Sequence, residues 1–144
     1  MHAIVAWIVG LSLAANGMMM LAGPSQWYVA MPGVIDTGLF NAHFVREIGA
    51  AYFVAGTALV WLALSNKAWP AALAAAAFLA LHAFVHLADL AAGREHAHQM
   101  LIDIPIIFVP PLAALWLVWR PGPRGANSRK GNKHDEMVSA ALDQ

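Results

Sequence analysis

Long stretches without a charged side chain most restrict how this chain can fold. Residues 3–22 contain no charged residue, and residues 48–64 form a second uncharged run. A helix of about 20 apolar residues is long enough to cross the roughly 30 Å hydrocarbon core of a bilayer. Only 11% of the residues are charged, whereas about a quarter are charged in ordinary soluble domains. The lipid bilayer is therefore the expected solvent of this chain.

Four apolar segments are predicted to be membrane-spanning helices, at residues 3–22, 41–64, 68–90 and 100–119. Asn41 is placed to cap the second helix, the third is rich in alanine and suited to close packing, and Pro105, Pro110 and Pro111 should kink the fourth. The predicted fold is an all-α four-helix transmembrane bundle with short loops. Residues 120–144 turn polar and basic, which predicts a disordered tail.

The distribution of lysine and arginine predicts how the helices are oriented. Loops rich in these residues stay in the cytoplasm. One side of the predicted bundle has Lys67 in a turn and Arg120, Arg124, Arg129, Lys130 and Lys133 in the tail, and the other side has Arg46 and Arg94. Both termini are therefore expected to be cytoplasmic. In a bacterial inner membrane, residues 23–40 and 91–99 would then face the periplasm.

The composition excludes several classes of function. The chain has no cysteine, which rules out thiolate nucleophiles, thiolate metal sites and disulfides. Its formal net charge is zero, and nucleic-acid binding needs a concentrated basic surface. Histidine and carboxylate groups must therefore carry any chemistry, and no nucleic-acid partner is expected.

The histidine and charged residues of the membrane region gather at the predicted periplasmic end. They are His43, Arg46 and Glu47 at the start of the second helix, His82, His86 and Asp89 at the end of the third, Asp103 at the start of the fourth, and His96 and His98 in the preceding loop. A charged side chain that faces lipid costs about 3 kcal/mol on insertion scales. We therefore expect these side chains to face one another inside the bundle.

Two imidazoles at positions i and i+4, such as His82 and His86, can bind one metal ion from a single helix. The candidate ligands for Zn, Fe or Cu are His43, Glu47, His82, His86 and Asp89, supported by Arg46, His96, His98 and Asp103. An open coordination position with bound water would make such a site catalytic, although no nucleophile motif accompanies it. Two alternatives stay open. In a non-enzymatic subunit or assembly factor, the cluster would only fix helix packing, through an ion pair between Arg46 and Asp89 for example. The other alternative is a path for protons or solutes.

Two motifs carry a resemblance to known proteins. The sequence FNAHFVREIGAAY at residues 40–52, LHAFVHL at residues 81–87 and the proline-rich fourth helix resemble those of small, uncharacterised four-helix proteins of the bacterial inner membrane. The resemblance covers most of residues 1–119 and omits the tail. It implies the same membrane fold and brings no assigned activity.

The expected partners are the bilayer itself and either a second copy or another membrane protein.

Overall fold

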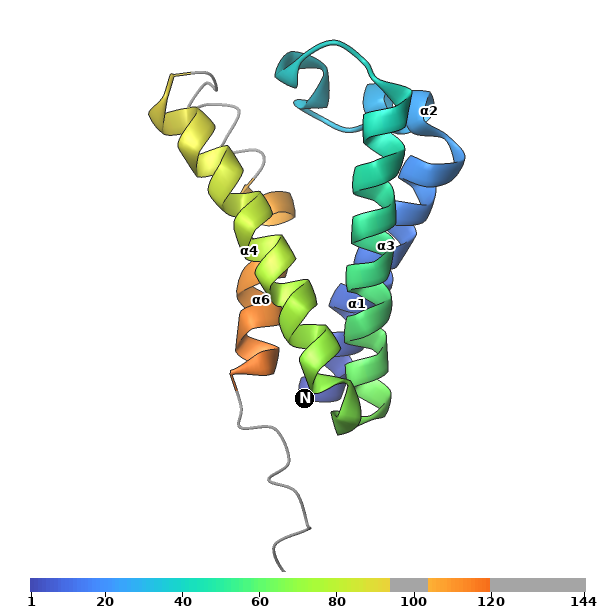
Figure 1. The fold of residues 1–144 in the computed structure, drawn as a ribbon, viewed down its shortest axis with the longest axis vertical. Helices are drawn as coiled ribbons and strands as arrows, with labels where there is room; N and C mark the ends of the chain where they lie inside the picture. The colour runs from blue at the N-terminus through green and yellow to red at the C-terminus, as the bar shows by residue number, and fades with distance from the viewer. Residues whose placement is uncertain (94–103, 120–144) are drawn as a thin grey trace, which may run out of the picture.

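A computed structural model describes residues 1–93 and 104–119, and every regular element in that part of the chain is helical (Figure 1). The elements in order are α1 (His2–Ala22), α2 (Pro24–Ala30), the 3-10 turn η1 (Val34–Thr37), α3 (Ala42–Leu64), the 3-10 turn η2 (Asn66–Ala68), α4 (Trp69–Ala91) and α6 (Val109–Val118). Three helical stretches are long and apolar enough to cross a membrane, at His2–Ala22, Ala42–Leu64 and Asn66–Ala91. The prediction of an all-α chain is confirmed for the described residues.

The fourth predicted span differs from the other three because of its prolines. The described apolar helix there is Ile104–Val118, with a turn at Phe108 before α6, and residues 100–103 lie outside the described part. Pro110 and Pro111 stand in the first turn of α6. Proline has no backbone N–H to bond to the carbonyl oxygen four residues earlier, so a new helix can begin at these prolines but a regular helix cannot run through them. Fifteen residues of helix extend about 22 Å, less than the roughly 30 Å of a bilayer core.

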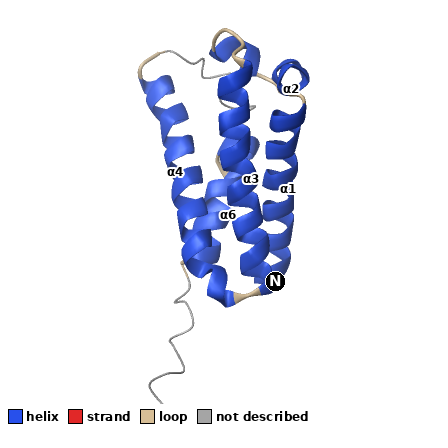
Figure 2. Ribbon diagram, turned by 45° about the vertical axis from the view of Figure 1, so that its right-hand side comes forward, coloured by secondary structure: helices blue, strands red, loops and turns tan. Residues whose placement is uncertain are grey.

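The closest packing between helices is made by glycine on α1 and α3, which lie side by side (Figures 1 and 2). A β-carbon at Gly17 would lie 2.5 Å from both the Gly49 oxygen and the Phe53 nitrogen, and one at Gly56 would lie 2.4 Å from the Ala14 nitrogen. Real β-carbons essentially never approach other atoms this closely. The backbones of α1 and α3 therefore touch because glycine occupies these positions.

The hydrophobic core joins all four of the longer helices. Its buried members are Ala6 and Leu13 of α1, Leu59 of α3, Ala72, Ala76 and Leu79 of α4, and Ala114, Leu117 and Val118 of α6. The indole of Trp69 donates to the Val118 oxygen at 2.9 Å, and the ring of His2 stacks on Trp116 with 4.0 Å between centroids. These contacts close the end of the bundle that holds the N-terminus and η2.

At the opposite end, α4 leans away from α1 and α3 (Figure 1). The first turn of α3 and the last turn of α4 are therefore separated, although both belong to the same end of the molecule. This separation decides which of the candidate site residues meet.

Candidate functional site

His82 and His86 lie on the side of α4 that faces α3. Their ring centroids are 5.0 Å apart with 67° between the ring planes, and both residues are half-buried. Positions i and i+4 lie one turn apart on the same face of a helix, so the local periodicity of α4 brings the two imidazoles together. Asp89, also half-buried, lies about one turn further along the same stripe.

The aromatic ring of Tyr52, on α3, contacts this pair. The rings of Tyr52 and His82 meet edge to face with centroids 5.4 Å apart, and Phe78 packs against Tyr52 at 5.5 Å and near His82 at 6.2 Å. Tyr52 was not among the candidate residues. No local pattern marks it, because the residue of α3 that meets His82 depends on how α3 packs against α1 and α4.

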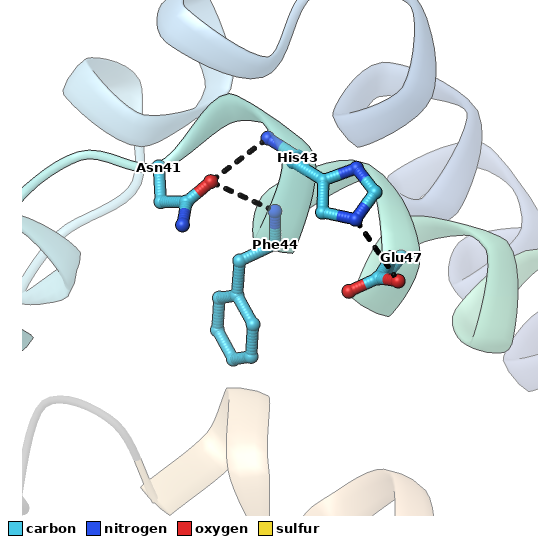
Figure 3. Close-up of polar contacts among 4 residues, drawn as sticks. All are labelled: Asn41, His43, Phe44 and Glu47. Carbon is cyan, nitrogen blue, oxygen red and sulfur yellow. Dashed lines mark hydrogen bonds and ion pairs between the residues drawn. The ribbon is translucent and has the colours of Figure 1, made fainter.

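His43 and Glu47 form a pair of their own on the first turns of α3 (Figure 3). The Asn41 side chain caps the helix by accepting hydrogen bonds from the backbone N–H groups of His43 at 3.0 Å and Phe44 at 3.1 Å. The His43 Nε2 atom lies 3.3 Å from the Glu47 Oε1 atom, and the two side chains are 84% and 61% exposed. This pair faces away from the bundle interior.

The outward position of this pair follows from the helix periodicity. Val45 is buried against the rest of the bundle. At about 100° per residue, a residue two positions before or after Val45 lies about 160° from it around the helix. His43 and Glu47 occupy those positions. The expectation that they face the third predicted helix is therefore not met in this structure.

Arg46 extends toward α1. Its Nε–H group donates to the Leu21 carbonyl oxygen at 3.4 Å, in the last turn of α1, where the final carbonyls of a helix have no intrahelical partner. Arg46 thus helps to satisfy the C-terminal end of α1. The supporting residues His96, His98 and Asp103 lie outside the described residues.

Within residues 1–93 and 104–119, no three His, Asp or Glu side chains lie close enough together to hold one metal ion. The structure therefore brings together His82 with His86, and His43 with Glu47, as two separate pairs. His82 and His86 are the pair that faces another helix, and this makes them the centre of the candidate site.

The fold and the site define a broad class: an all-helical protein with three helices suited to crossing a membrane and a half-buried histidine pair on one of them. Comparison with family models, curated proteins and solved structures gives no match. The function must therefore be argued from the geometry of this chain.

Proposed function

We propose that this chain is an integral membrane protein that binds a divalent transition metal through His82 and His86. The observation that carries the proposal is the 5.0 Å separation of the two ring centroids. Two imidazoles bound to one tetrahedral ion at about 2.0–2.1 Å have their ring centres roughly 5 Å apart. The two rings are therefore spaced as two ligands of one ion would be. Ionisable residues in membrane spans are also rare because they are costly, and those that occur commonly mark functional sites.

Asp89 is the proposed third ligand because it follows His86 by three residues on the same face of α4. Its side chain does not lie close enough to both imidazoles to share an ion with them in the structure, so metal binding would require it to change rotamer. Its oxygen atoms together with two imidazole nitrogens suit Zn, Fe or Cu. The Tyr52 ring against His82 restricts the orientation of that imidazole, as contacts around metal ligands commonly do. A water molecule in the fourth position would leave the site open to a substrate. His43 and Glu47 are not part of this proposal.

Metal analysis of the purified protein tests the proposal. After incubation with Zn²⁺ and removal of free metal, we expect stoichiometric zinc in the wild type and background zinc in the His82→Ala/His86→Ala variant, because both imidazole ligands are gone. The matched control is His43→Ala/Glu47→Ala, which removes the exposed pair and should keep its zinc. Each variant is checked by its thermal unfolding curve in detergent. A wild type without zinc, or a His82/His86 variant that retains it, contradicts the metal site.

We further propose that the chain crosses a bacterial inner membrane four times, with both termini in the cytoplasm. The support comes from the three long apolar helices, the shorter apolar helix at Ile104–Val118, and the concentration of lysine and arginine on one side. Under this topology α2 and the start of α3 face the periplasm, and so does the end of α4 that carries Asp89.

Single cysteines test this topology cleanly because the chain has none of its own. We expect Ser25→Cys, exposed on α2, to react with a membrane-impermeant maleimide added to intact cells. Lys67→Cys in η2 and Ser139→Cys in the tail should react only after permeabilisation, because both would lie in the cytoplasm. Reaction of Ser25→Cys only from the cytoplasmic side would reverse the orientation. Reaction of both Ser25→Cys and Ser139→Cys in intact cells would rule out four crossings.

A packing role is the second candidate function, and the aromatic cluster between α3 and α4 favours it. His82 is in ring contact with Tyr52 and lies close to Phe78, as a purely structural residue would. The protein would then be a non-enzymatic membrane subunit or assembly factor. This role predicts that Zn²⁺ leaves the unfolding temperature of the wild type unchanged, while His82→Ala lowers it. Metal binding predicts instead that Zn²⁺ raises the unfolding temperature of the wild type and not that of the His82→Ala/His86→Ala variant.

A further inference from the structure

The segment that connects α1 to α3 has a defined conformation. The Trp27 indole in α2 donates to the Asn16 Oδ1 atom of α1 at 2.8 Å. The Tyr28 hydroxyl donates to the Gly38 carbonyl oxygen at 2.6 Å, and the Tyr28 ring packs against Phe40 at 5.2 Å. We call residues 24–40 the cap segment. Trp27 and Tyr28 turn their polar atoms toward the protein and hold the segment in place.

The cap segment and the residues after it expose large apolar side chains. Those at the surface are Val29 (69% exposed), Ile35 (55%), Leu39 (100%), Phe40 (43%) and Phe44 (58%). Residues 23–45 contain neither lysine nor arginine. If the segment lay in water, these apolar side chains would stay in contact with water, which is unfavourable. Large exposed apolar patches therefore mark interaction sites.

The position of the cap segment indicates what covers these side chains. Figure 2 shows α2 close to end-on while α1 runs along the bundle, so α2 lies across the bundle axis. The cap segment directly follows α1, whose last turns expose Met18 and Met19. The exposed apolar surface of a candidate membrane span thus continues onto a helix that lies across it. Of the five large side chains, only Val29 belongs to α2, and the others follow it in the cap segment and at the start of α3. A segment that lies across a membrane span and exposes apolar side chains suits the interface of a bilayer.

We propose that the cap segment is an interfacial anchor whose apolar side chains, Leu39 above all, insert just below the lipid head groups of one leaflet. This inference rests on the proposed membrane crossing and is independent of the metal site. Because residues 23–45 have neither lysine nor arginine, the apolar part of the bilayer is the partner. Anionic head groups, which basic residues recognise, are not required.

Fluorescence quenching in lipid nanodiscs tests this anchor. An environment-sensitive probe is attached to Leu39→Cys, with Val54→Cys (64% exposed in α3) as the reference within the span and Lys67→Cys (exposed in η2) as the aqueous reference. We expect the Leu39 probe to lose most of its fluorescence with lipids brominated near the head group, and little with iodide in the water. The quenching should be equal in phosphatidylcholine nanodiscs and in nanodiscs that also contain phosphatidylglycerol. The same result is expected for Ile35→Cys.

Three results would overturn the proposal, and each has a different meaning. The Val54 reference is measured with lipids brominated near the middle of the acyl chains. If iodide quenches the Leu39 probe while these lipids quench the Val54 probe, the cap segment is in water and the membrane crossing stands. If the Val54 probe escapes these lipids, the crossing itself is wrong. If neither quencher reaches the Leu39 probe, a protein surface such as a second copy of this chain covers the cap segment.

Discussion

Replacing Gly56 with leucine is expected to separate α1 from α3 and to lower the free energy of unfolding by about 3 kcal/mol, the upper end of the usual cost of overpacking. A β-carbon at this position would lie 2.4 Å from the Ala14 nitrogen and 2.6 Å from the Gly10 oxygen. Both atoms belong to the backbone of α1, so no side chain can rotate to make room. The two helices must move apart and lose contacts along their length.

The matched control for this change is Ala50→Leu, which adds a similar side chain to an exposed position of α3 and should change stability little. Unfolding in mixed detergent and SDS, followed by circular dichroism, measures both variants. If Gly56→Leu does not fold at all, Gly56→Ala keeps the effect measurable, because the β-carbon alone produces the clash. Equal stability of Gly56→Ala and the wild type would show that α1 and α3 are not in backbone contact.

Leu59→Ala is expected to cost about 2 kcal/mol, near the lower end of the range for buried leucine. Leu59 is fully buried within the core that joins α1, α3, α4 and α6, so its truncation leaves a cavity that four helices line. When the helices separate within a bilayer, the Leu59 side chain contacts lipid and not water, and lipid is as apolar as the core. The loss of packing contacts therefore remains, while most of the transfer free energy from water does not contribute.

Leu81→Ala is the control for this prediction, because Leu81 is 67% exposed on α4 and its truncation should change stability by less than about 0.5 kcal/mol. The same unfolding measurement applies. If Leu59→Ala and Leu81→Ala were equally mild, the helices would not share the core described here. A cost near 5 kcal/mol for Leu59→Ala would instead indicate that water surrounds the unfolded helices.

Much of the helical structure could be predicted because its signals are local. Uncharged runs are visible in the sequence and correspond to α1, α3 and α4, and the predicted cap at Asn41 is confirmed by the hydrogen bonds that its side chain accepts. The prolines predicted a disturbed fourth helix, and the structure has a turn at Phe108 before α6. The short helix α2 was missed because seven residues carry too little periodicity to stand out from a loop.

The candidate site was predictable only in part. His82 and His86 share one face of α4 because their spacing matches the helical repeat, and no other part of the chain is needed for that. Tyr52 was missed because the residue that meets His82 depends on how α3 is rotated about its axis. Glycine decides this rotation, since the face of α3 that carries Gly49 and Gly56 packs against α1. His43 and Glu47 consequently point outward.

The sequence by itself determined the three long apolar helices, the cap at Asn41 and the stripe of histidines on α4. Each of these depends on residues within a few turns of one another. The tertiary structure alone decided that α1 and α3 meet at glycine, that α4 leans away at the end where α3 begins, and that the predicted cluster separates into two pairs. Helix rotation and crossing depend on contacts between residues far apart in the chain, which no local pattern contains.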